Sequence, residues 1–286
     1  MKAEYKKIVL LANNFPSERS PARSPFNYNL AQQLSKIADV EVIVFRTVGL
    51  RKIKPQSYIY NSIKVKEVYL PIIPFGTTSI PFSSSYLVTF ISTIIASICI
   101  KLLNLNFKNC IFHSISAGFI SVIGDIISRK NNSPHFIQLI GSDVNIQLPI
   151  YKRIPAFRAA VNNAKGIISN SKSLANNLSK SGLKYNTVKV IYRGANRDNF
   201  RAGINYGFSH KTINFLYLGG IIKSNEFSDG NKKGGITLFN AWSKDQHFFT
   251  ERGANLYFGG PIDGYAPHDP IINDFKSKET VFFLGE

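Results

Sequence analysis

Short apolar runs alternate with helix-like segments along most of the chain. The apolar run at residues 7–12 is followed by a helical pattern at 27–38, which places Leu30 and Leu34 on one face, and then by a second apolar run at 40–45. Continuous apolar runs joined by helices are typical of buried parallel strands with right-handed crossovers. The first 45 residues therefore predict the opening of a doubly wound α/β sheet.

The same alternation continues to the end of the sequence. We expect further strands at 109–115, 135–141, 166–171, 188–194, 213–220, 254–260 and 280–286, and an edge strand within 65–75. We expect helices at 86–103, 118–130, 151–164, 172–182 and 236–244. The polar stretch at 201–211 is the best linker, so the pattern predicts two α/β domains, 1–205 and 206–286.

The positive charge is concentrated in the first predicted domain. The chain has a formal net charge of +18, and residues 1–205 hold 27 Lys and Arg against 8 Asp and Glu. Ten bases and no acid lie between residues 151 and 197. Such a field attracts nucleic acid or an anionic membrane face, whereas a generally basic protein would not be so one-sided. The sequence has no RNP-like aromatic pair or helix-turn-helix signal, which disfavours nucleic acid.

The apolar segment at 86–103 is the one stretch that suggests a membrane. Its uncharged length of about 15 residues is short of the roughly 20 that span a bilayer, so we expect a buried or interfacial helix. The apolar run at 8–12 is too short for a signal peptide and is better explained as a strand. Cys99 and Cys110 lack the spacing of a metal site or a disulfide framework, which fits a reducing cytoplasm.

The stretch 215–235, "FLYLGGIIKSNEFSDGNKKGG", joins a strand to a helix through glycines and lysines. A helix N-terminus offers unpaired N–H groups and the positive end of its dipole to a phosphate, and an adjacent lysine adds a full charge. Glycine also lets the backbone approach a ligand closely. The alternative is structural: the glycines end a strand, and the lysines are solvated at the start of a helix.

Several segments, in this order, resemble family 4 retaining glycosyltransferases, which have the two-lobed GT-B fold. In the first domain they are "FPSERSPARSPFNYNLAQQL", "QLIGSDVN", "IISNSKSLANNL" and "VIYRGANRDNF"; in the second they are "FLYLGG", "KKGGITLFNAW", "LYFGG" and "VFFLGE". The resemblance touches most of the chain and depends on the order and spacing of the blocks. It implies two Rossmann-like domains, an acceptor lobe followed by a nucleotide-sugar lobe.

The resemblance also implies site residues. Lys233 is the first choice for stabilising charge on the departing diphosphate and Lys223 the second, and His113 and Asp143 are the other catalytic candidates. The remaining donor-diphosphate candidates are Gly219, Gly220, Lys232 and Gly234. The acceptor-side candidates are Ser24, Gly141, Ser142 and Arg193. Structural alternatives stay open: Ser142 or Asp143 can cap a turn, His113 can be a satisfied core residue, and Arg193 can be one more base. No metal and no cofactor besides the donor substrate is expected.

The sequence departs from the family pattern at several positions. The arginine that usually follows the strand glycine is Ile221, the histidine of the HGSD block is Ile140, the second histidine of His-x-His is Ile115, and a glycine of the first loop is Ser24. The Glu-x7-Glu block that holds the donor sugar is also missing, because the chain ends at Glu286. We therefore expect a chain truncated within the donor lobe.

The expected activity is transfer of a sugar from a nucleotide-sugar donor to a lipid-linked or polysaccharide acceptor, with retention, in cell-envelope glycan synthesis. The expected location is the cytoplasm, at the anionic inner face of the plasma membrane, with 152–158 and 86–103 as contact segments. One alternative is a catalytically incomplete GT-B-like binding protein, favoured by the departures. Another is a sugar-nucleotide epimerase, which would share the lobes but not the "YRG" and "KGG" blocks.

Overall fold

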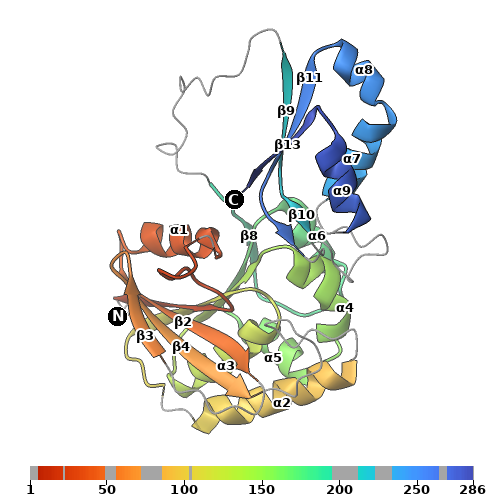
Figure 1. Cartoon of the computed structure of the whole chain (residues 1–286). Coiled ribbons are helices and arrows are strands. Elements are labelled where there is room, and N and C mark those ends of the chain that lie inside the picture. Colours follow the sequence, from red (N-terminus) through yellow and green to blue (C-terminus); the bar gives the residue numbers. More distant parts are fainter. Residues whose placement is uncertain are drawn as a thin grey trace. The chain divides into compact units, whose positions relative to one another are not determined.

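The computed structural model describes residues 6–21, 23–48, 56–71, 86–102, 105–194, 212–222, 234–263 and 269–285. They belong to two compact units, Met1–Gly194 and Ala195–Glu286, which are labelled by element in Figure 1. The boundary predicted between 205 and 206 lies outside the described residues and stays a prediction.

The N-terminal unit is built on an eight-stranded sheet with the order β3-β4-β2-β1-β5-β6-β7-β8. Its strands are β1 (Lys7–Ala12), β2 (Asp39–Val48), β3 (Gln56–Tyr60), β4 (Ile63–Pro71), β5 (Cys110–Ile115), β6 (His135–Leu139), β7 (Gly166–Ser169) and β8 (Val188–Val190). Every neighbouring pair is parallel except β3 with β4. The predicted doubly wound α/β architecture is confirmed.

Helices cover this sheet on both faces. Helix α1 (Pro25–Leu34) packs on one face, while α2 (Tyr86–Leu102), α3 (Phe119–Lys130), α5 (Pro155–Asn163) and α6 (Lys172–Ser179) pack on the other. Because side chains alternate along a strand, Val9 and Leu11 of β1 join the larger core under α3, and Leu10 and Ala12 join the smaller core under α1. This two-sided burial explains why β1 is apolar throughout.

Two expectations for this unit were wrong. Strand β4 is not at the edge, because β3 pairs antiparallel with it through a turn at Asn61 and Ser62, whose φ angles of 43° and 69° suit a tight hairpin. The helix expected at 151–164 is broken: a π-helical turn, η1 (Asp143–Gln147), leads into α4 (Leu148–Tyr151), and α5 starts afresh at Pro155. Proline lacks an N–H, so it begins a helix more readily than it continues one.

The C-terminal unit has a three-stranded parallel sheet with the order β13-β11-β9. Its elements are β9 (Ile213–Leu218), β10 (Ile221–Ile222), α7 (Gly235–Lys244), α8 (Gln246–Glu251), β11 (Ala254–Gly259), β12 (Ile262–Asp263), α9 (Pro270–Ser277) and β13 (Val281–Gly285). Phe239 of α7 stacks on Phe275 of α9 with ring centroids 3.5 Å apart, and both side chains are fully buried. The predicted strands and the helix after 235 are confirmed, whereas α8 and α9 were not predicted.

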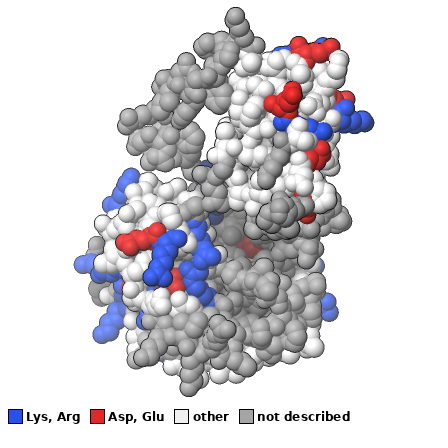
Figure 2. Space-filling view, in the orientation of Figure 1, with Lys and Arg blue, Asp and Glu red and all other residues white. Residues whose placement is uncertain are grey.

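The described surface carries the charge asymmetry of the sequence. Basic side chains predominate on the visible face of the N-terminal unit in Figure 2, whereas acidic and basic side chains are mixed on the C-terminal unit. Among the helices that the structure describes, none combines the length and the apolar character needed to cross a bilayer.

Candidate functional site

The carboxyl edge of the N-terminal sheet has a topological switch point between β1 and β5. From β1 the chain proceeds outward through β2 and β4 on one side, and then returns to continue through β5, β6 and β7 on the other. In open α/β sheets, ligands bind outside the carboxyl ends of the strands at such a point, because the loops there diverge and leave a crevice. The loops after β1, β5 and β6 thus define the candidate acceptor site.

Asp143, a predicted catalytic residue, joins two of these loops. Its Oδ2 accepts from the N–H of Ala117 at 2.7 Å, and its Oδ1 accepts from Gly141 at 2.7 Å and Val144 at 3.0 Å. The N–H of Ile140 lies 3.2 Å from both oxygens. Burial, at 1% exposure, raises the pKa of Asp143, and the four donors oppose that rise. The geometry favours a structural role that holds the two loops together, and η1 has no side-chain cap bond, so the capping role is not seen, while a catalytic role stays a prediction.

Each of the two loops that Asp143 joins has a residue with a positive φ angle, and the one at Ser116 is strained. Ser116, after β5, has φ 148° and is buried, and Gly141, after β6, has φ 145°. Few residues other than glycine adopt such angles, and they persist only where surrounding contacts hold them. The neighbouring Ser142, an acceptor-side candidate, is exposed beside them. Asp143 therefore fixes the shape of the strand ends where the site is expected.

His113, the second candidate from this sheet, lies in β5 close to the same edge. It is 7% exposed, and burial lowers its pKa to about 4, with the neighbouring Gln138 side chain opposing the shift in part. Within the described part of the chain, His113 Nε2 and Gln138 Oε1 have no hydrogen-bond partner. Gln138 Nε2 in turn donates to Asn170 Oδ1 at 2.8 Å. A row of neutral polar groups, in which the His113 and Gln138 side chains also interact with each other, thus crosses β5, β6 and the end of β7.

The loop after β1 is held by a buried aromatic ring. Phe15 is fully buried and meets Tyr28 and Tyr60 edge-on, each with centroids 6.3 Å away. At the end of the loop, Ser24 has φ 53° and ψ 53° and makes no side-chain cap bond to α1. These left-handed angles suit glycine best. Ser24 therefore adopts a backbone conformation that glycine would favour.

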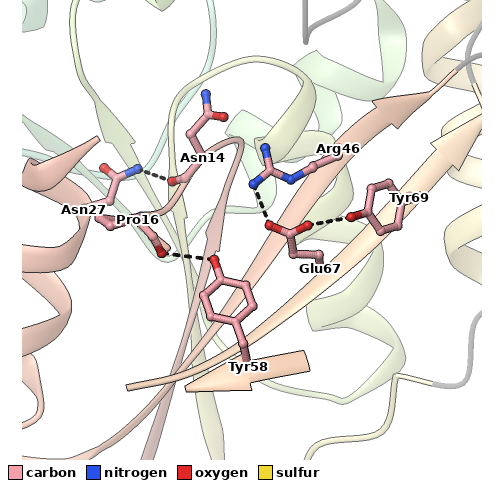
Figure 3. Close-up of polar contacts among 7 residues, drawn as sticks. All are labelled: Asn14, Pro16, Asn27, Arg46, Tyr58, Glu67 and Tyr69. Atoms are coloured by element: carbon pink, nitrogen blue, oxygen red, sulfur yellow. Dashed lines mark hydrogen bonds and ion pairs between the residues drawn. The ribbon is translucent and has the colours of Figure 1, made fainter. Parts of the chain in front are cut away.

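A polar cluster that the sequence did not predict lies on the α1 face of the sheet and is drawn in Figure 3. Arg46 Nη2 lies 2.5 Å from Glu67 Oε1, and the Tyr69 hydroxyl donates to Glu67 Oε2 at 2.6 Å. Tyr58 donates to the carbonyl of Pro16 at 3.1 Å, which ties β3 to the loop after β1. Burial opposes ionisation of Glu67, but the bonds from Arg46 and Tyr69 outweigh it and lower its pKa. These contacts join β2 to β4 and hold β3 to the loop after β1, on the α1 side of the site.

The remaining candidate of this unit, Arg193, lies after β8 with an exposed side chain. Its guanidinium carbon is 5.1 Å from the centroid of the Phe26 ring, within the range of a cation–π contact. Phe26 belongs to α1, immediately after the loop that ends at Ser24. Arg193 is thereby held beside the first turn of α1.

Three donor-side candidates lie in the described part of the C-terminal unit. Gly219 and Gly220 both donate to the Gly259 carbonyl, at 3.0 and 3.1 Å. A Cβ on Gly220, whose φ is 65°, would come 2.2 Å from the Pro261 oxygen, so glycine is required there for packing. Gly234 has φ 81° and precedes α7, and its Cβ position is open. Lys223, Lys232 and Lys233 lie outside the described residues, and the ligand roles of all six stay predictions.

The fold was compared with known proteins. No family model and no curated protein matches the chain. Among solved structures, it is similar to sucrose-phosphate synthase from Thermosynechococcus elongatus, with 12% identity, a TM-score of 0.57 and coverage of 98% of this chain and 70% of that chain. It is similar to Anabaena HepE in complex with UDP-glucose, with 14% identity, a TM-score of 0.55 and coverage of 98% and 68%. It is also similar to an α,α-trehalose-phosphate synthase from Burkholderia vietnamiensis, with 8% identity, a TM-score of 0.62 and coverage of 98% and 73%.

At these identities the similarity shows the fold. The chain has the GT-B type of α/β fold, with two Rossmann-like parallel-sheet units, and it spans about 70% of the solved chains. The predicted fold class is confirmed.

Proposed function

We propose that the protein is a glycosyltransferase that moves a sugar from a nucleotide-sugar donor to an acceptor hydroxyl with retention of configuration, as in family 4. The observation that carries the proposal is the GT-B fold together with polar groups at the carboxyl edge of its first sheet. A similar solved structure, that of HepE, is a complex with UDP-glucose, which supports a nucleotide-sugar donor.

On the donor side, the bond between the anomeric carbon and the diphosphate breaks, and negative charge grows on the departing diphosphate. Helix α7 begins just after Gly234, so its first N–H groups and its dipole favour an anion there. We assign the principal charge to Lys233, with Lys232 and Lys223 as supporting cations, because a full positive charge stabilises a leaving diphosphate most strongly. The proposed reaction requires no cofactor and no metal ion.

On the acceptor side, the neutral polar row of β5 to β7 holds the hydroxyl that bonds to the anomeric carbon and gives its proton to the departing diphosphate. A pKa of about 4 leaves His113 uncharged at neutral pH and makes it a weak general base. We therefore assign it the task of orienting the acceptor, with Gln138 beside it. Asp143 fixes the loops around it, and Gly141, Ser142, Ser24 and Arg193 line the acceptor side.

We place this reaction at the cytoplasmic, anionic face of the plasma membrane, where the protein is peripherally bound. The support is the excess of bases in residues 1–205, since each base near an anionic surface adds roughly 1 kcal/mol of attraction. An acceptor that is a lipid-linked glycan or a polysaccharide precursor of the cell envelope, including lipopolysaccharide, fits this setting.

The test is release of nucleoside diphosphate from a panel of UDP-, GDP- and ADP-linked sugars in the presence of a lipid extract. We expect release from at least one donor, with Lys233→Ala lowering the rate by about a hundredfold. Lys244→Ala, at the other end of α7, is the matched control and is expected to change the rate less than twofold. Absence of release from every donor would contradict the proposed activity.

A second candidate is a binding protein of GT-B type without turnover. Ile115 and Ile221, which stand where the family has a histidine and an arginine, are 3% and 1% exposed, so both are core residues here. In this case a sugar nucleotide would bind in a Lys233-dependent manner and no diphosphate would be released. The same panel, measured for both binding and release, separates the two candidates.

A further inference from the structure

Helix α2 carries its largest aliphatic side chains outward. Leu87, Ile94, Ile98 and Leu102 are 61%, 43%, 55% and 81% exposed. With 3.6 residues per turn, these four positions fall within a sector of about 80° around the helix axis. They form one continuous ridge, here called the α2 stripe. Figure 1 shows α2 lying along the outside of the N-terminal unit.

The inward face of α2 is mixed in character. Among its described residues, Tyr86, Phe90 and Cys99 pack partly buried against the core, and the fully buried ones are Thr89, Ser92, Thr93, Ala96 and Ile100, of which only Ile100 is large and aliphatic. Thr93 Oγ1 donates to the Thr89 carbonyl at 2.7 Å, so this hydroxyl is satisfied within the helix. Small side chains let α2 approach the rest of the unit closely. A helix with water on its outer side normally shows the reverse distribution.

The α2 stripe displays an apolar surface where polar residues are expected. A contiguous exposed apolar patch of this kind marks a contact with a protein or a membrane. The helix has 17 residues, or about 25 Å at 1.5 Å per residue, which is less than the roughly 30 Å hydrocarbon core. A helix of this length with an apolar outer face is suited to lie in the plane of a membrane interface.

Basic groups stand at both ends of the stripe. The Arg153 guanidinium carbon is 4.7 Å from the centroid of the Tyr86 ring at the start of α2, and Lys101 is exposed in its last turn. Helix α2 contains no acid. In the elements packed against it, the described carboxylates are buried and paired: Asp125 with Arg129 at 3.0 Å, and Glu67 with Arg46. The surroundings of the stripe therefore favour an anionic partner.

We propose that the α2 stripe docks the N-terminal unit onto an anionic lipid bilayer, with its four aliphatic side chains in the interface and Arg153 and Lys101 at lipid phosphates. This inference deepens the membrane setting of the proposed function and rests on it. A second copy of the chain is a poorer partner, because two N-terminal units with 25 bases against 7 acids each would repel one another.

The test is co-sedimentation with vesicles at physiological salt. Wild-type protein is expected to bind vesicles of phosphatidylcholine with phosphatidylglycerol more strongly than vesicles of phosphatidylcholine alone. The double variant Ile94→Gln/Ile98→Gln is expected to lower the partition coefficient roughly tenfold or more. The matched control Ile37→Gln/Ile59→Gln changes two isoleucines that are 79% and 66% exposed elsewhere in the unit, and is expected to bind as wild type.

A depth measurement makes the test independent of folding defects. A tryptophan at position 98, from Ile98→Trp, is expected to be quenched by brominated lipids, whereas one at position 59, from Ile59→Trp, is not. The native Trp242 lies in the other unit and is buried, so it gives the background signal. Unquenched fluorescence from Ile98→Trp on bound vesicles would overturn the inference.

The outcomes separate this inference from the proposed function. If wild type and the α2 double variant bind anionic vesicles equally, the docking surface lies elsewhere and the membrane setting survives. If wild-type protein binds anionic vesicles no better than neutral ones, both the docking surface and the membrane setting are wrong. Sugar transfer is then still tested by the panel of donors. If the double variant instead loses self-association in gel filtration with unchanged vesicle binding, the stripe is an interface between copies.

Discussion

The Asp143 carboxylate accepts the backbone N–H of Ala117 at 2.7 Å, although 26 residues separate them. This bond crosses from the loop after β6 to the loop after β5, beside the switch point of the sheet. Asp143 is thereby the residue that gives the candidate acceptor site a fixed shape.

Replacing this carboxylate should destabilise the N-terminal unit. Asp143→Asn places an amide N–H₂ against N–H donors and leaves some of them unpaired, so we expect a loss of about 2–4 kcal/mol in the free energy of unfolding. Urea denaturation measures it. Asp39→Asn, at a carboxylate with 60% side-chain exposure, should cost less than about 0.5 kcal/mol. Equal small effects at both sites would mean that Asp143 does not brace the loops.

Acid should destabilise the fold through two buried histidines. Burial lowers the pKa of His113 to about 4 and, with repulsion from His113, that of His135 to about 3. Above pH 6.5 both are neutral whether the chain is folded or not, so they contribute nothing. Below it the unfolded chain binds protons that the folded chain excludes until pH 4 and 3. Stability should therefore fall by up to about 1.4 kcal/mol per pH unit for each histidine.

Denaturation midpoints at pH 7.5, 6.0 and 5.0 measure this slope. His247→Gln, at a histidine whose side chain is 88% exposed, is the control and should leave the slope unchanged. A midpoint that stays constant from pH 7.5 to 5.0 would show that neither histidine resists protonation.

Ser24 offers a substitution that should stabilise the protein. Its φ of 53° costs a serine about 1 kcal/mol relative to glycine, and its side chain gives no cap bond in return. We expect Ser24→Gly to raise the free energy of unfolding by about 0.5–1 kcal/mol. Ser35→Gly, at φ −65° after the same helix, should have the opposite sign. If both substitutions lower the free energy of unfolding, Ser24 is not strained.

The Arg46–Glu67 pair should show strong coupling. Arg46→Met leaves an ionised carboxylate with 8% side-chain exposure unpaired, at an expected cost of about 3–5 kcal/mol. Arg46→Met/Glu67→Met removes both charges and should regain most of that loss. The more exposed pair Lys278–Asp274, with side-chain exposures of 23% and 52%, gives the comparison, since Lys278→Met should cost under about 1 kcal/mol. If the double variant is no more stable than Arg46→Met, the two side chains are not coupled.

The sequence predicted those parts of the structure that depend on local pattern. Strands β1 and β5 are buried on both faces, so their sequences are mostly apolar and could be recognised as strands. Strand β3 was not predicted, although Tyr58 and Tyr60 alternate with more exposed residues as in a strand, because it is only five residues long and directly follows the basic, proline-containing stretch 51–55. The Arg46–Glu67 pair was not predicted either. The two residues are 21 positions apart in the sequence, and only the pairing of β2 with β4 brings them together. The orientation of α2 depends on its packing, which hydropathy does not reveal.

The candidate site was predicted by a different kind of signal. Asp143 stood out because a polar block follows a buried strand, but its four backbone donors come from folded loops that no pattern encodes. Ser24 stood out only through the resemblance, which places a glycine there. The lysines at 223, 232 and 233 lie outside the described residues, so their roles rest on sequence.

In the proposed enzyme, the C-terminal unit binds a nucleoside diphosphate through Lys233. Isothermal titration with UDP, GDP and ADP, each paired with its monophosphate, measures this binding. We predict that one diphosphate binds at least tenfold more tightly than its monophosphate, and that Lys233→Ala abolishes this difference. No preference for any diphosphate, or an undiminished preference in Lys233→Ala, would show that Lys233 does not hold the donor diphosphate.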